Sequence, residues 1–190
     1  MVKEGVLENP KVDAIFGLHV FPFDTGTLAW RSRGIMAAGD RFEILIRGRQ
    51  THGAQPWNGI DPIVVGSQVV MGLQTLVSRQ VDLTVAPAIV TIGAFNAGNR
   101  HNIIPDEAKL IGTLRTYDPA MRATLIERIK RTASSIAASA GASAEVVFNQ
   151  GLPVTWNDPA LTSRMEGTLK RVAGPLARPD ISPSTTSEDF

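Results

Sequence analysis

Residues 40–47 read Asp-Arg-Phe-Glu-Ile-Leu-Ile-Arg, and residues 61–80 read Asp-Pro-Ile-Val-Val-Gly-Ser-Gln-Val-Val-Met-Gly-Leu-Gln-Thr-Leu-Val-Ser-Arg-Gln. In the first segment Phe42, Ile44 and Ile46 occupy every second position, which is the period of a β-strand. In the second segment the apolar residues recur at helical spacing, behind an Asp that suits the N-cap and a Pro that suits the first helical position. The two segments therefore predict a strand that leads, through a long polar loop, into a helix.

Four further elements follow in the same part of the chain. The pattern predicts strands at 88–95, 107–115 and 144–148, and a helix at 120–140 behind Asp118-Pro119. The order strand, helix, strand, strand, helix, strand is that of the ferredoxin-like, or split βαβ, plan, with two helices on one face of a four-stranded antiparallel sheet. We assign this plan to residues 37–150, and a mixed α/β and α+β fold to the whole chain.

The segments on either side, residues 1–36 and 151–190, are each too short to fold alone. We expect them to form two parts of one α/β domain into which residues 37–150 are inserted. The run Val12-Asp-Ala-Ile-Phe-Gly-Leu-His-Val20 is apolar almost throughout, which predicts a strand buried on both faces, as in a parallel sheet. Because Ser187-Glu-Asp-Phe190 follows a Pro-rich loop, it is expected to lead into another element, and the chain to be a fragment.

The composition excludes several classes of protein. With 43% hydrophobic residues, 19% charged residues and no Cys, the 190-residue chain is typical of an ordinary soluble globular protein, and not of a disordered chain, a collagen or a disulfide scaffold. The formal net charge is +1, so the sequence offers no basic surface for nucleic acid or an anionic membrane. Residues 60–77, the most apolar stretch, are too polar to span a bilayer. No signal peptide is visible, so we expect a cytoplasmic location.

Few residues are candidates for chemistry. His19 lies at the end of the predicted buried strand, where α/β sheets present ligand-binding groups, although a core histidine is the alternative. His52 lies in a loop with small neighbours before a helix and is able to donate a hydrogen bond to a developing oxyanion, whereas the alternative is a surface side chain. His101 is expected to be solvated. Arg115, at the end of a strand, is suited to bind a carboxylate through two hydrogen bonds, and the alternative is an ion pair with Asp118.

Other catalytic motifs are missing from the sequence. It has no cysteine nucleophile, no G-x-S-x-G elbow, no P-loop and no dinucleotide fingerprint. A catalytic metal ion commonly takes three protein ligands, and His19 alone is well placed to be one. Any metal site must therefore be completed by residues that this sequence lacks.

Five motifs occur in an order that resembles a known family. They are Met1 to Val20 with its Gly-Leu-His-Val end, His52-Gly-Ala-Gln-Pro56, Asn102-Ile-Ile-Pro-Asp106, Gly112-Thr-Leu-Arg115 and Ser187-Glu-Asp-Phe190. The chain, over nearly its whole length, resembles the metal-dependent amidohydrolases typified by hippurate hydrolase, N-acyl-amino-acid amidohydrolases and plant indoleacetyl-amino-acid hydrolases. Such a resemblance implies a catalytic α/β domain with a dinuclear metal centre, interrupted by a ferredoxin-like lid that also dimerises.

The same resemblance implies roles for individual residues. His19 corresponds to a metal ligand. His52 corresponds to the lid histidine that stabilises the tetrahedral transition state, often in the site of a neighbouring subunit. Asn102 and Arg115 correspond to lid residues that line the substrate pocket, with Arg115 near the substrate carboxylate. Ser187-Glu-Asp-Phe190 corresponds to a wall of the active site, with no ligand role.

The departures from the family pattern limit what this chain is expected to do alone. A Cys-Gly-His-Asp-type segment and a Glu-Glu pair, which supply ligands and the general base, are absent upstream, as is a later metal-binding His. We therefore expect the full-length enzyme to hold two divalent ions (Mn, Zn, Co or Ni), and this chain alone to be inactive or nearly so and to bind none.

The expected function is hydrolysis of the amide bond of N-acyl amino acids such as hippurate by the full-length protein. The expected partners are a small N-acyl amino acid or peptide substrate and a second copy of the chain. The resemblance implies that the two copies are joined through the lid, and this agrees with the edge strand at 88–95, which would expose unpaired backbone in a monomer. Two alternatives stay open. One is a non-catalytic dimerisation or binding module, and the other is an aminopeptidase or dipeptidase of the same superfamily.

Overall fold

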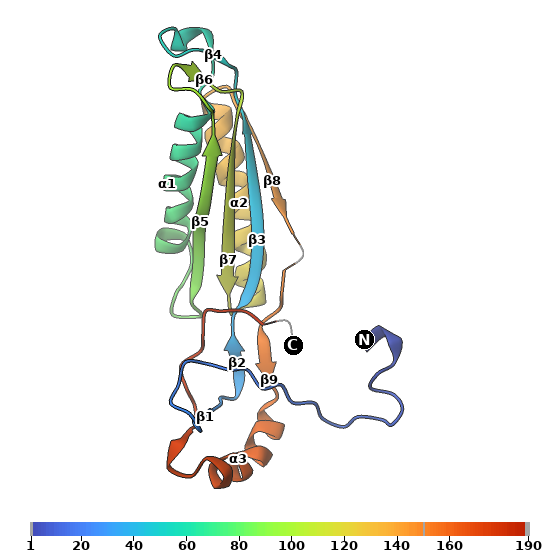
Figure 1. Ribbon diagram of the computed structural model, residues 1–190. Coiled ribbons are helices and arrows are strands. Elements are labelled where there is room, and N and C mark those ends of the chain that lie inside the picture. Colours follow the sequence, from blue (N-terminus) through green and yellow to red (C-terminus); the bar gives the residue numbers. More distant parts are fainter. Residues whose placement is uncertain (1, 150, 189–190) are drawn as a thin grey trace. The chain divides into compact units, whose positions relative to one another are not determined.

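The computed structural model describes residues 2–149 and 151–188, and the chain is a mixed α/β protein (Figure 1). These residues divide into two compact units. The sheet unit comprises residues 36–149, 151–155 and 184–188, and the flanking unit comprises residues 2–35 and 156–183. Each unit is described by itself below.

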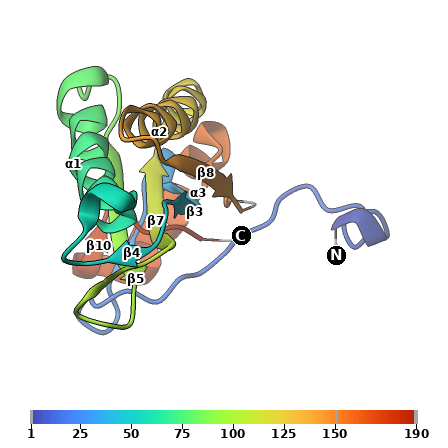
Figure 2. The same ribbon diagram turned by 90° about the horizontal axis from the view of Figure 1, so that it is seen from above.

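The sheet unit is a four-stranded antiparallel sheet with two helices on one face (Figures 1 and 2). The strand order is β5-β7-β3-β8. The bounds of its six main elements are β3 (Ala38–Arg47), α1 (Pro62–Gln80), β5 (Ala88–Ala97), β7 (Glu107–Thr116), α2 (Pro119–Ser139) and β8 (Ser143–Phe148). All six lie where the sequence pattern predicts them. Among the described residues, no helix is long and apolar enough to cross a membrane.

The core of the sheet unit lies between the sheet and the two helices. Alternate side chains of β3 are buried: Phe42, Ile44 and Ile46 have no exposed surface. They pack against the buried stripes of the helices, which consist of Val65, Val69, Leu73 and Leu76 in α1 and Leu125, Ile129, Ala133 and Ala137 in α2. A strand period of two on one side and a helix period of 3.6 on the other thus produce a single apolar layer.

Both long helices begin in the same way. The side chain of Asp61 accepts hydrogen bonds from the backbone N–H groups of Ile63 (2.8 Å) and Val64 (3.3 Å), and Asp118 accepts one from Met121 (2.6 Å). A proline follows each Asp, where the missing N–H costs nothing. These caps are the signals from which the helix starts are predicted.

At one end of the sheet two loops form a short ladder of their own. β4 (Thr51–His52) pairs antiparallel with β6 (Ile103–Ile104), and the 3-10 helix η2 (Pro56–Asn58) follows β4. Gly48 donates a backbone hydrogen bond to the carbonyl oxygen of Asp106 (2.7 Å), which ties the bases of the two loops together. We call this ladder and η2 the tip of the sheet unit (Figure 1).

The remaining elements of sheet and helix lie wholly or mostly in the flanking unit, and α3 is the longest of them. They are η1 (Val2–Glu4), β1 (Leu28–Ala29), β2 (Arg33–Met36), β9 (Thr155–Asn157), α3 (Pro159–Ala173), η3 (Gly174–Leu176) and β10 (Ala177–Arg178). β1 pairs parallel with β10, and Trp30 donates a backbone hydrogen bond to Arg178 (3.1 Å). Helix α3 was not predicted, although Asp158-Pro159 repeats the start of α1 and α2 and Asp158 caps the N–H of Leu161 (2.7 Å).

One expectation about the flanking segments is wrong. Residues 12–20 form no strand, and Leu18 and Val20 are each 87% exposed, because no described residue supplies the neighbouring strands and covering layers that a parallel strand needs. Residues 151–155 and 184–188 group with the sheet unit. For the first of these segments the reason is hydrogen bonding, because Gly39 and Leu152 exchange two backbone bonds of 3.0 and 2.9 Å.

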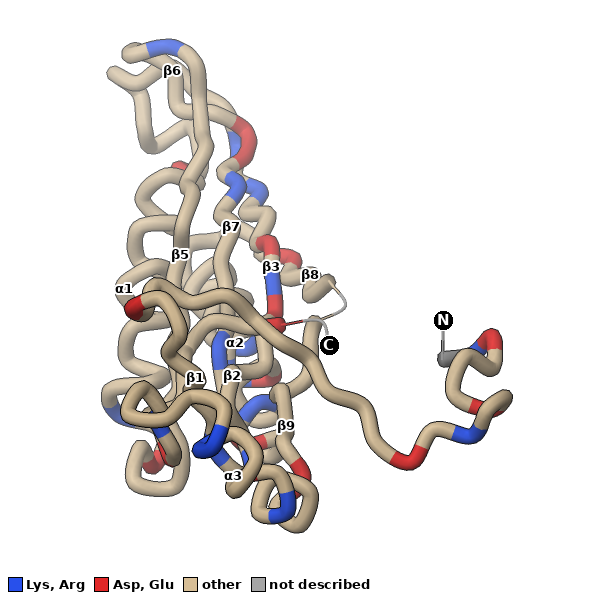
Figure 3. Tube along the Cα trace, turned by 60° about the horizontal axis from the view of Figure 1, so that its bottom comes forward, with Lys and Arg blue, Asp and Glu red and all other residues tan. Residues whose placement is uncertain are grey.

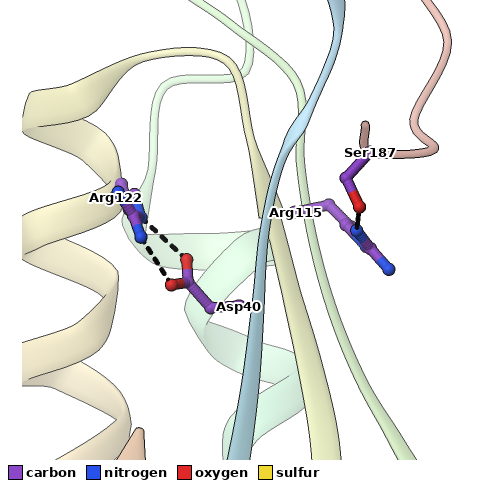
Figure 4. Close-up of polar contacts among 4 residues, drawn as sticks. All are labelled: Asp40, Arg115, Arg122 and Ser187. Atoms are coloured by element: carbon purple, nitrogen blue, oxygen red, sulfur yellow. Dashed lines mark hydrogen bonds and ion pairs between the residues drawn. The ribbon is translucent and has the colours of Figure 1, made fainter. Parts of the chain in front are cut away.

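A buried ion pair joins the start of β3 to the first turn of α2 (Figure 4). Arg122 donates from Nε to Oδ2 of Asp40 (2.8 Å) and from Nη2 to Oδ1 (2.6 Å). The Asp40 side chain is 3% exposed and that of Arg122 is 30% exposed. The hydrogen bond to Asp40 raises the pKa of the Arg122 guanidinium above its ordinary value. The guanidinium group therefore stays charged at every pH at which the protein is folded.

Replacing Arg122 by Met should therefore destabilise the sheet unit by about 2 kcal/mol at pH 7, because the carboxylate of Asp40 stays buried without its cation. Urea denaturation of the unchanged protein and the variant at pH 7 measures this loss. The control Arg131→Met removes an exposed arginine from the same helix and should change stability by less than about 0.5 kcal/mol. Equal stability losses in Arg122→Met and Arg131→Met would contradict the interpretation.

Candidate functional site

His52 and Asn102 come together at the tip of the sheet unit. In the ladder His52 lies opposite Ile103, and the backbone N–H of Gly53 donates to the carbonyl oxygen of Asn102 (2.8 Å). Both side chains belong to exposed residues. Two motifs that are distant in the sequence therefore lie next to each other in the backbone of the tip.

The orientation of the His52 ring is set by its own loop. The backbone N–H of Ala54 donates to Nδ1 (3.1 Å), and the N–H of Gln55 donates to the His52 carbonyl oxygen (2.8 Å). A ring nitrogen that accepts a hydrogen bond carries no proton, so the neutral ring holds its proton on Nε2. No described residue accepts from Nε2, and this donor is left for another molecule.

Gly53 allows the two loops to approach each other. A Cβ atom added at Gly53 would lie 3.1 Å from the carbonyl oxygen and 3.2 Å from the carbonyl carbon of Asn102. The sequence predicts that the small residues after His52 let another backbone or a substrate approach closely, and in the structure the backbone of Asn102 does so at Gly53.

Arg115 lies at the opposite end of β7 from the tip. Its neighbours in the sheet are Gly39 on β3 and Ile89 on β5. Nη1 of Arg115 donates to the hydroxyl oxygen of Ser187 (Figure 4). The alternative partner Asp118 instead caps α2, so the ion pair weighed from the sequence does not form.

The segment that carries Ser187 is fastened to the base of the sheet unit. The backbone N–H of Ala37 lies 3.1 Å from the carbonyl oxygen of Ser184 and 2.9 Å from that of Thr186, and the hydroxyl of Tyr117 donates to the Ser184 carbonyl. The family resemblance implies that this segment is a wall of the active site with no ligand role. No local pattern indicates the contact of Ser187 with Arg115, because it joins residues that only tertiary folding brings together. Asp189 and Phe190 of the same motif lie outside the described residues.

The two groups of candidate residues are far apart within one chain. β7 has ten residues, and a strand rises about 3.4 Å per residue, so the ends of β7 are roughly 30 Å apart. The tip with His52 and Asn102 lies at one end, and Arg115 lies at the other (Figure 1). A small substrate that touches Arg115 cannot also touch His52 of the same chain.

His19 has one feature that suits a metal ligand, although it is exposed and not in a buried strand as predicted. Its Nδ1 contacts the carbonyl oxygen of Val20 (2.7 Å), and its ring packs on Phe21 with the centroids 5.1 Å apart. Histidines that bind metals commonly donate one ring N–H to a carbonyl and bind the ion through the other nitrogen. However, the described residues contain no group of three His, Cys, Asp or Glu that could hold a metal ion, so they do not form a metal site by themselves.

Residues 37–140, more than half of the chain, match the family model described as the peptidase dimerisation domain of the M20 peptidases. The chain belongs to the M20 family. The resemblance to metal-dependent amidohydrolases is thereby confirmed, since proteins of this family are among its relatives.

Three relatives show the range of this M20 group. An N-acyl-L-amino acid amidohydrolase from Geobacillus stearothermophilus is 40% identical over 152 residues, covering 80% of this chain and 40% of that protein. Thermostable carboxypeptidase 2 from Saccharolobus solfataricus is 33% identical, covering 100% of this chain and 47% of that protein. The crystal structure of a Bacillus subtilis protein described as a dinuclear metal binding peptidase from the M20 family is 33% identical with a TM-score of 0.72, covering 100% of this chain and 46% of that one. The chain thus spans about half the length of the curated relatives that it matches.

The close approach at the tip is testable with Gly53→Ala. The added methyl group presses on the backbone of Asn102, so the Gly53 N–H should separate from the Asn102 carbonyl and exchange its hydrogen at least about ten times faster than in the unchanged protein. Hydrogen exchange measured by mass spectrometry or NMR reports this amide. Gly167→Ala, at a position with no atom within 4 Å of the added carbon, is the control and should leave the tip unchanged. Equal protection of the Gly53 amide in both variants would show that the ladder tolerates the methyl group.

Proposed function

We propose that the full-length protein is a metal-dependent amidohydrolase of the M20 family that hydrolyses the amide bond of N-acyl amino acids, hippurate-like substrates included. The sheet unit is its lid and dimerisation domain, with the ferredoxin-like plan. The strand order β5-β7-β3-β8, with two helices on one face, supports that plan. The observation that carries the function is the joining of the His52 and Asn102 loops at the tip, through the His52–Ile103 pair and the Gly53–Asn102 backbone bond, in a chain with amidohydrolase relatives. The cytoplasmic location stays a prediction.

His52 is the proposed electrostatic catalyst. Attack on an amide carbonyl places negative charge on its oxygen, and a donor positioned for that oxygen lowers the barrier. The Ala54 N–H holds the ring so that Nε2 carries the proton, which is the state needed to donate to the oxyanion. Asn102, in the adjoining loop, is proposed to line the substrate pocket.

Arg115 is the proposed binder of the substrate carboxylate. A guanidinium group matches a carboxylate through two parallel hydrogen bonds, and an N-acyl amino acid has one carboxylate beside the scissile amide. This group explains why the same architecture serves amidohydrolases and carboxypeptidases, since both kinds of substrate end in a carboxylate. A carboxypeptidase is therefore the second candidate, supported by the relative of that name. Comparing N-acetyl amino acids with dipeptides as substrates separates the two.

The proposed cofactor is a pair of divalent metal ions, Mn, Zn, Co or Ni, bound by the full-length protein. The crystal structure of the M20 relative described as dinuclear supports this number. When bound, such ions supply a nucleophilic hydroxide at neutral pH. Of the described residues, His19 alone is proposed as a ligand, and the 190-residue chain is accordingly proposed to be inactive without the remaining ligands.

The proposed assembly is a homodimer through α1 and the edge strand β5. Helix α1 has one charged residue, Arg79 in its last turn, and most of its trace is tan in Figure 3. Its exposed side chains include Ile63, Val64 and Met71. An uncharged exposed face beside an unpaired strand edge is typical of a surface covered in the native assembly. The roughly 30 Å between the ends of β7 supports an exchange in which the tip of one copy serves the site of the other.

Replacing His52 by Ala in the full-length protein should lower kcat by about a hundredfold or more, because one donor to the oxyanion is lost. His101→Ala, which changes an exposed histidine in the same tip region, is the matched control and should keep activity within about twofold. Steady-state hydrolysis of N-acetyl amino acids measures both. Unchanged activity in His52→Ala would favour the non-catalytic dimerisation module instead.

A charge on the exposed face of α1 should separate the dimer. Met71, with 70% of its surface exposed, becomes a buried residue in the proposed interface, so Met71→Glu should raise the dissociation constant at least about a hundredfold. Sedimentation of the full-length protein over a range of concentrations measures the change. Ser135→Glu adds the same charge to an exposed position of α2 and should leave the dimer intact. A monomeric wild-type protein at high concentration would refute the proposed assembly.

A further inference from the structure

The guanidinium group of Arg115 is only partly used within the chain. The side chain is half-buried, and Nη1 donates to the hydroxyl oxygen of Ser187. Neither Nε nor Nη2 has a hydrogen-bond partner among the described residues. The contact with Ser187 therefore fixes one arm of the guanidinium group and leaves the opposite edge free.

A second arginine of the sheet unit, Arg122, shows how the Nε and Nη2 edge of a guanidinium group binds a carboxylate. Arg122 contacts Asp40 through Nε and Nη2, at 2.8 and 2.6 Å, and so grips both carboxylate oxygens (Figure 4). The corresponding edge of Arg115 has no carboxylate from the chain. Because Nη1 is held by Ser187, a carboxylate from a ligand would meet Nε and Nη2 in the same two-bond geometry.

Gly39 makes room for this arrangement. It lies opposite Arg115 in the register of β3 and β7. A Cβ atom at Gly39 would lie 2.1 Å from Nη1 of Arg115 and 2.6 Å from the hydroxyl oxygen of Ser187. The two polar groups meet directly over the α-carbon of Gly39, in space that any other residue would fill.

Ser187 is held in place independently of Arg115. The backbone bonds from Ala37 to Ser184 and Thr186, and the parallel bridge between Met36 and Ser184, fasten the segment just before it. A hydroxyl presented from a fastened backbone restricts a flexible arginine far more than solvent does, which lowers the entropy lost when a ligand is bound.

We propose that Ser187 is a positioning residue: its hydroxyl holds Nη1 of Arg115 over Gly39, so that Nε and Nη2 face the carboxylate of the substrate. This inference deepens the proposed function and rests on it for the identity of the ligand. It adds the serine of the Ser187-Glu-Asp-Phe190 motif, and Gly39, to the residues that determine selection of carboxylate substrates.

The test compares two substrates on the full-length, metal-loaded protein: an N-acetyl amino acid and its carboxamide, which lacks the carboxylate. Ser187→Ala should lower kcat/KM for the acid about tenfold, mostly through KM, and should change kcat/KM for the carboxamide less than about twofold. Thr185→Ala, an exposed neighbour in the same segment, is the control and should leave both values unchanged.

Two further variants separate positioning from simple structural damage. Ser187→Thr retains the hydroxyl, so its KM for the acid should be close to that of the unchanged protein. Gly39→Ala should reproduce the tenfold loss while the protein stays folded, because the added carbon meets the mobile end of the Arg115 side chain and not backbone. Thermal unfolding of each variant checks the fold.

Three outcomes would overturn the proposal. In the first, Ser187→Ala lowers kcat/KM equally for the acid and the carboxamide. In the second, it changes neither. In the third, a crystal structure of Ser187→Ala shows the Arg115 guanidinium in its wild-type position. A wild-type protein that hydrolyses neither substrate would refute the proposed function only, and the crystal structure would still decide the positioning role.

Discussion

Strand β3 lies between β7 and β8, and its alternate side chains Phe42, Ile44 and Ile46 are completely buried beneath the two helices. Because side chains alternate in a strand, a shift of β3 by one residue would turn these three side chains away from the helices. The register of β3 with β7 is therefore determined by burial of apolar surface. That register also places Gly39 opposite Arg115, so the same constraint that forms the core positions the arginine.

The two ends of the sheet have different chemistry. At the tip, exposed loops present His52 and Asn102, held by a two-residue ladder and by a glycine that lets the backbones touch. At the base, Arg115 is half-buried and constrained by the segment 184–188. Strand β7 separates the two groups by its length, so they do not form one site within a single copy of the chain.

The two helices of the sheet unit differ in the charge of their exposed sides. Helix α2 carries charged residues on its exposed side, among them Glu127 and Lys130, which pair with each other at 3.1 Å. Helix α1 has none before Arg79, although it is as long and lies on the same face of the sheet. Both helices pack on the sheet, but their exposed residues differ in charge. This difference is consistent with the proposed interface through α1.

The sequence alone determined the six elements of the sheet unit and the helix caps, because strand and helix periods and an Asp-Pro start are local signals that the core then reinforces. It also indicated His52, Asn102 and Arg115 as the residues to consider. Only the tertiary structure decided that residues 12–20 form no strand, since a buried strand needs neighbours that no local pattern supplies. It likewise decided that Arg115 contacts Ser187 and not Asp118, because that contact depends on a register and on a returning segment 72 residues further along the chain.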